Sequence, residues 1–99
     1  MTPEEIIGEV ALVTGVPAPA ITGRRRNKYI VHARFLAMAA VREAFGWWSL
    51  QMTADFFHRE DHGTIINARA RHLELLKTDP IYKAHATQIR RHLFACPSR

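Results

Sequence analysis

Apolar residues recur along the chain at steps of three and four positions, which is the spacing of one face of an α-helix. The longest stripe falls within residues 29–45 and has five members, at steps of four, three, three and four: Val31, Phe35, Met38, Val41 and Phe45. Gly46 ends the pattern. We therefore expect residues 29–45 to form the central helix of the core. No segment alternates apolar and polar residues as a half-buried strand does.

Two shorter helices are expected before this one. Thr2 can cap the first, Pro3 suits its first turn, and Glu5 completes a capping box. Apolar residues then follow at helical spacing: Ile6, Ile7, Val10, Ala11 and Val13. Gly15 suits the position just after a helix end, because glycine adopts the left-handed conformation without strain. Residues 17–21 should form a short second helix that Gly23 closes.

Residues 49–76 have the pattern of a helix-turn-helix, in which two helices are joined by a tight turn. Ser49 is a suitable N-cap for a helix that ends near Phe56, and Phe56 and Phe57 are expected in the core at the turn. Asp61 can cap a second helix that runs to about Lys77. The residues expected on its inward face are Ile65, Ala68, His72 and Leu75 or Leu76.

The last expected helix begins at Pro80, after Thr78 and Asp79, because proline fits a first helical turn but stops the helix before it. Its inward residues are expected to be Tyr82, Ala86, Ile89 and Leu93. The whole pattern predicts an all-α fold of about six helices. We assign residues 1–96 to a single domain and residues 97–99 to a tail.

Length and composition agree with one globular domain, since 99 residues with an apolar content of 47% can bury a core of their own. The single cysteine, Cys96, has no partner for an internal disulfide, which suits a reducing compartment. Neither a secretory signal nor an apolar stretch long enough to span a bilayer is found. We expect a cytoplasmic, nucleoid-associated protein with no membrane partner.

The charge is unevenly distributed. The formal net charge is +5, and five of the fourteen basic residues fall within eleven positions that contain no acid: Arg24, Arg25, Arg26, Lys28 and Arg34. Three of the nine acidic residues lie on the first expected helix. Such asymmetry suits a polyanion bound on one side of the molecule, and the expected partner is double-stranded DNA.

Two stretches carry a resemblance to a known family. Residues 23–38, GRRRNKYIVHARFLAM, look like a basic loop of the type K-R-R-x-R and the helix that follows it. Residues 54–68, ADFFHREDHGTIINA, look like the signature G-x-x-F-G-G-R-D-H-T-T-V-x-H-A. At this separation the two motifs together resemble the C-terminal DNA-binding domain (domain IV) of the bacterial replication initiator DnaA, over roughly residues 6–93. The resemblance implies a Trp-repressor-like bundle with a helix-turn-helix.

The resemblance also implies which residues contact DNA. The family's minor-groove arginine falls on Arg26, and Arg24, Arg25 and Lys28 match loop positions that contact the backbone or groove. On the helix-turn-helix the matching positions are Leu50, Gln51, Asp61, His62, Gly63, Thr64, Asn67 and Arg71. The second helix would lie in the major groove, with its N-terminal side chains at the base edges. We also expect Arg34 to neutralise phosphate charge, or else to tie two helices together.

Several of these positions depart from the family pattern. Gly63 stands where the family usually has a base-contacting threonine, Glu60 replaces an arginine, Gln51 a proline and Asn67 a histidine, while His58 and Arg59 replace a Gly-Gly turn. Each altered base contact is worth ~1–3 kcal/mol of discrimination, so these changes are enough to retarget the domain. The alternative is a protein-interaction module that keeps the fold without base-specific recognition.

Other chemistry is not indicated by the sequence. The family's ATPase domain is not found, and no G-x-x-x-x-G-K-S/T motif occurs, so no nucleotide or other cofactor is expected. His58 and His62 are four residues apart, but a helix break is expected between them, and we predict no metal site. No nucleophile–base set is positioned by sequence, so we expect no enzyme. The prediction is a free-standing DNA-binding regulator of replication initiation or transcription.

Overall fold

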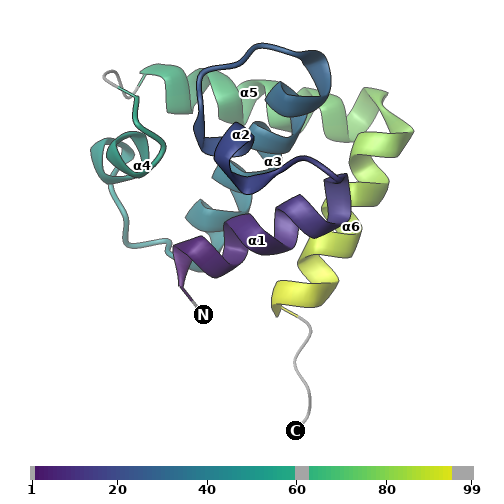
Figure 1. Ribbon diagram of the computed structural model, residues 1–99, viewed down its shortest axis with the longest axis horizontal. Helices are drawn as coiled ribbons and strands as arrows, with labels where there is room; N and C mark the ends of the chain where they lie inside the picture. Colours follow the sequence, from purple (N-terminus) through teal and green to yellow (C-terminus); the bar gives the residue numbers. More distant parts are fainter. Residues whose placement is uncertain (1, 60–62, 95–99) are drawn as a thin grey trace, which may run out of the picture.

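The computed structural model describes residues 2–59 and 63–94, and within these ranges the chain forms six helices and no strand (Figure 1). The helices, in chain order, are α1 (Pro3–Thr14), α2 (Ala18–Thr22), α3 (Lys28–Ala44), α4 (Leu50–Phe56), α5 (Gly63–Thr78) and α6 (Pro80–Phe94). The predicted all-α fold with about six helices is confirmed.

Where the structure describes them, the predicted helix boundaries agree with the observed ones to within about one residue: the helix expected at 29–45 is Lys28–Ala44, and the helix expected at 17–21 is Ala18–Thr22. The Thr2 hydroxyl accepts a hydrogen bond from the Glu5 amide at 3.1 Å, while the Glu5 carboxylate accepts one from the Thr2 amide at 2.7 Å, which completes the capping box. Gly15 ends α1 at φ 76°, in the left-handed region. Ser49 caps α4 through a 3.0 Å bond from the Met52 amide. The predicted cap Asp61 lies outside the described residues.

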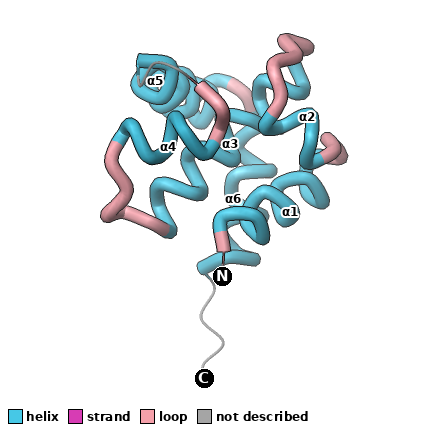
Figure 2. The backbone as a smooth tube through the Cα atoms, turned by 60° about the vertical axis from the view of Figure 1, so that its left-hand side comes forward, coloured by secondary structure: helices cyan, strands magenta, loops and turns pink. Residues whose placement is uncertain are grey.

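Helix α3 lies at the centre of the bundle, between α5 on one side and α1 and α6 on the other (Figure 2). Its buried residues spread further round the helix than the predicted stripe: Ala33, Arg34, Leu36, Ala37, Met38, Ala40 and Val41. The predicted positions Phe35 and Phe45 are only partly buried. The difference arises because α3 is contacted by all five other helices, so that it has no single inward face.

The helix-turn-helix is formed by α4 and α5. Phe57 is fully buried at the turn, and on α5 the predicted inward residues Ile65, Ala68 and Leu75 are buried. His72 is half-buried, and its Nδ1 lies 2.6 Å from the hydroxyl of Tyr82 on α6. His72 is thus a hydrogen-bonded core histidine.

The turn after α4 contains a residue with unusual backbone geometry. His58 has a φ of 57°, in the left-handed region that favours glycine. His58 stands where the family pattern has the first glycine of its Gly-Gly turn. The turn therefore holds a histidine in a conformation that glycine adopts with less strain.

Candidate nucleic-acid interface

The predicted basic loop connects α2 to α3 and is exposed. Arg24, Arg25 and Arg26 are exposed, and so is Lys28, the first residue of α3. The helix start is fixed by Asn27, whose side-chain oxygen accepts a hydrogen bond from the Tyr29 amide at 3.0 Å. Four exposed cations in five positions give a strongly positive edge to the molecule.

Arg34 does not belong to this exposed surface, which corrects the expectation that it neutralises phosphate. Its side chain is buried, and its guanidinium donates hydrogen bonds to three backbone carbonyls: those of Ile21 at 2.8 Å, Ala20 at 3.1 Å and Arg25 at 2.9 Å. Burial, and then the charge of Arg59, lower the pKa of Arg34 from its ordinary value. Arg34 ties α3 to the end of α2 and to the loop, as the alternative interpretation held.

Arg59, in the turn of the helix-turn-helix, makes the second attachment to the loop. Its guanidinium donates a 2.6 Å hydrogen bond to the Gly23 carbonyl, thirty-six residues away in the sequence. Burial, followed by the charges of Arg24 and Arg26, lowers the pKa of Arg59. The sequence marked this residue only as a departure from the Gly-Gly turn, because a partner so distant in the chain leaves no local signal.

A hollow of about 450 Å³ brings the two predicted halves of the interface together. Four arginines line it, of which three come from the loop and the turn: Arg24, Arg26, Arg34 and Arg59. Thr64, near the start of α5, lines the same hollow, and its back wall is formed by Val31, Phe35, Met38 and Ala68. Cations gathered around a cavity wall repel one another, and a bound anion relieves that repulsion.

The outer face of α5 presents the other predicted reading residues. Thr64, Asn67 and Arg71 are exposed, and their spacing of three and four places them on one side of the helix. Arg71 forms an ion pair with Glu74, in which both side chains are more than half exposed. An exposed pair of this kind contributes little and can exchange for a phosphate or base contact.

The remaining residues predicted to contact DNA differ in their exposure to solvent. Gln51 is exposed, and its amide donates to the Asp55 carboxylate at 2.9 Å. Leu50 is half-buried and packs against the core. Gly63 is the first residue of α5. Asp61 and His62, predicted to contact bases, lie outside the described residues.

The part of the chain that the structure describes also bears on metal binding and on membrane spans. There, no three His, Cys, Asp or Glu side chains gather closely enough to hold a metal ion. None of the described helices combines the length and the apolar character needed to cross a membrane.

Comparison with known proteins agrees with the geometry. The family model described as "Bacterial dnaA protein helix-turn-helix" matches residues 3–71, which run from the start of α1 to the middle of α5 and contain the loop, the turn and the hollow. No curated protein matches the chain. The family match supports DNA binding and a connection with replication initiation. The chain belongs to the family of bacterial DnaA helix-turn-helix domains.

Proposed function

We propose that this domain recognises double-stranded DNA in two grooves at once, as a regulator of replication initiation or transcription. The start of α5 would lie in the major groove, and Arg26 would enter the adjacent minor groove. The observation that carries the proposal is the shared hollow: Arg26 of the loop and Thr64 of α5 line one cavity, although they are thirty-eight residues apart. Two elements held this close can bind adjacent grooves of one duplex.

Affinity would come mainly from the exposed cations of the loop. Arg24, Arg25 and Lys28 lie on a surface free of acidic neighbours in the sequence, as phosphate contacts require. Three phosphate contacts predict that log K falls with log salt concentration with a slope of about −3. Arg34 and Arg59 would contribute indirectly, because their hydrogen bonds to backbone carbonyls fix where the loop lies.

Specificity would come from the exposed side of α5. Asn67 suits the paired donor and acceptor of adenine, Arg71 suits guanine or a phosphate, and Thr64 can bond to either partner of a base pair. We also propose Asp61 as an acceptor for cytosine and His62 as a further base contact; in the sequence both come directly before α5. Gly63 offers no side chain where the family pattern has threonine, so the recognised sequence should differ from the family's box.

The test is a selection of bound duplexes from a random pool, followed by sequencing. The proposal expects one enriched motif in a single register. Arg26→Ala should weaken binding to all sequences and reduce the preference for A·T-rich flanks, whereas Asn67→Ala should change the preference at one base pair. Arg91→Ala is the matched control, since Arg91 is exposed on α6, away from the hollow. Enrichment no better than background would instead favour the protein-interaction module.

A further inference from the structure

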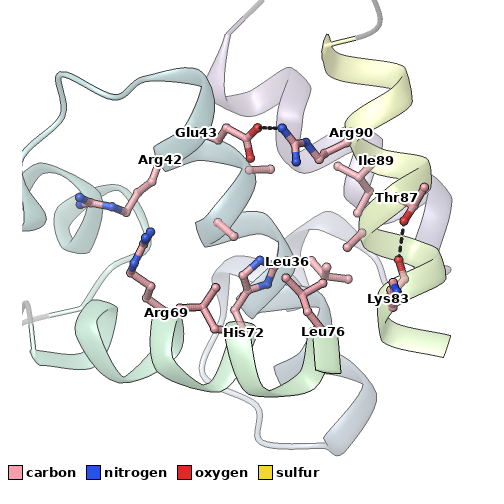
Figure 3. A pocket seen from close by; sticks show the side chains of 14 residues that line it. Leu36, Arg42, Glu43, Arg69, His72, Leu76, Lys83, Thr87, Ile89 and Arg90 are labelled. Atoms are coloured by element: carbon pink, nitrogen blue, oxygen red, sulfur yellow. Dashed lines mark hydrogen bonds and ion pairs between the residues drawn. The ribbon is translucent and has the colours of Figure 1, made fainter. Parts of the chain in front are cut away.

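A second hollow, of about 580 Å³, opens between α3, α5 and α6 (Figure 3). This volume lies in the range of pockets that bind small organic molecules. Apolar side chains from all three helices form most of its wall: Leu36, Ala40, Leu73, Leu76, Ala86 and Ile89. Leu73 is 47% exposed, which leaves apolar surface open to a ligand.

The rim of this hollow is strongly basic. Arg42, Arg69, Lys83 and Arg90 line it together with a single acid, Glu43. Arg90 forms a 2.9 Å ion pair with Glu43, so that acid does not balance the other three cations. In Figure 3 the side chains of Arg42 and Arg69 lie at the same end of the hollow, opposite Lys83 and Thr87. The described partner of Arg42 is the Thr53 hydroxyl, at 3.5 Å, which is a weak contact.

His72 adds a polar ring to the lining of this hollow. Nδ1 of His72 shares a 2.6 Å hydrogen bond with the hydroxyl of Tyr82, and burial raises the pKa of that hydroxyl. Burial also lowers the pKa of His72, which keeps the ring neutral near pH 7. The ring projects into the hollow from α5 (Figure 3).

We propose that the hollow binds a small organic anion, consisting of an apolar aromatic or aliphatic body that carries one carboxylate or sulfonate group. The acid group would lie between Arg42 and Arg69, and the body would lie against Leu36, Leu73 and Leu76. Charge complementarity selects this occupant: the wall is apolar, and three rim cations lack an acidic partner among the described residues. A guanidinium pair binds such an oxyanion by charge-assisted hydrogen bonds.

This site is separate from the proposed DNA-reading side of α5. Thr64 and Leu73 are nine residues apart, which is about two and a half helical turns, so their side chains leave the helix in opposite directions. The anion and DNA can therefore be bound together. The inference does not depend on whether the domain recognises a specific DNA sequence.

The experiment uses two fluorescent probes with similar apolar bodies and different charge. The anionic probe is 8-anilinonaphthalene-1-sulfonate, and the neutral probe is N-phenyl-1-naphthylamine. We expect the native chain to bind the anionic probe saturably with one site. Arg69→Gln should weaken that binding by about tenfold, as the loss of one charge-assisted contact implies, and should leave binding of the neutral probe nearly unchanged. Arg91→Gln, which removes an exposed cation of α6 outside the hollow, should behave as the native chain.

A second variant and a second measurement guard against probe binding to misfolded protein. Leu73→Glu places a carboxylate at a half-exposed position of the wall and should abolish binding of the anion while thermal unfolding remains cooperative. In the NMR spectrum of the native chain, the anion should shift the methyl signals of Leu36, Leu73 and Leu76. Each of three results would overturn the proposal. The first is an equal loss of anion binding in Arg69→Gln and Arg91→Gln. The others are no anion binding by the native chain and NMR shifts confined to residues other than these leucines.

Discussion

Replacing Arg34 by methionine tests whether one buried guanidinium holds the basic loop in place. Methionine is flexible and apolar and fills much of the same space, but it donates no hydrogen bond. In the native chain the guanidinium donates hydrogen bonds to the carbonyls of Ala20, Ile21 and Arg25, and burial disfavours its charged form. The substitution therefore removes three charge-assisted hydrogen bonds and also the cost of burying a charge.

The expected loss of stability follows from how deeply each bond lies. The bond to Ile21 is buried, while those to Ala20 and Arg25 are partly buried, so water can replace part of the last two. A hydrogen bond to a charged group contributes ~1.5–3 kcal/mol, and we expect a net loss of ~3 kcal/mol after the regained hydration of the charge is deducted. For a domain of this size, that lowers Tm by about 12–24 °C.

The assay is thermal and urea unfolding followed by circular dichroism, with Arg24→Met as the matched control. Arg24 is exposed, so its replacement should change stability by less than ~0.5 kcal/mol. Arg34→Lys keeps the positive charge but lacks the planar guanidinium with its several N–H donors. It should therefore recover only a small part of the lost free energy of unfolding. If Arg34→Met costs less than ~1 kcal/mol, or if lysine restores full stability, the interpretation of Arg34 as a geometric tie is refuted.

Three further predictions concern the turn and the core. Arg59→Met removes the hydrogen bond to the Gly23 carbonyl, which helps to hold the basic loop in place. In filter-binding titrations this variant should bind all duplexes severalfold more weakly. An effect confined to one base pair would contradict a positioning role for Arg59. His58→Gly should raise the free energy of unfolding by up to ~1 kcal/mol, because glycine adopts the positive φ of His58 with less strain. The greater freedom of glycine in the unfolded chain offsets part of this gain. A lower free energy of unfolding in urea titrations would show that the His58 side chain itself stabilises the turn. Burial lowers the pKa of His72 below that of the unfolded chain, so the unfolded state binds more protons. Stability should be complete above about pH 6.5 and fall as the pH drops below it, with a shallower fall in His72→Gln; identical pH profiles would contradict this assignment.

The sequence by itself determined the local structure of this protein, because the interactions that set helix boundaries join residues close together in the chain. The capping box of Thr2 and Glu5, the left-handed Gly15 and the Ser49 cap each act across three or four positions. Likewise, Ile65, Ala68 and Leu75 are buried where the helical period placed them. The all-α class and the helix-turn-helix follow from such signals, and two short motifs sufficed to indicate the family.

Only the tertiary structure decided which polar side chains form hydrogen bonds inside the protein and which remain exposed to solvent. Arg34 and Arg24 belong to the same basic run, yet the side chain of Arg34 is buried and bonded to three backbone carbonyls, whereas Arg24 is exposed. Arg59 reaches Gly23 across thirty-six positions. Helix α3 is buried on several sides because five helices surround it. Contacts between distant residues depend on how the helices pack, and neither charge nor periodicity along the chain records that packing.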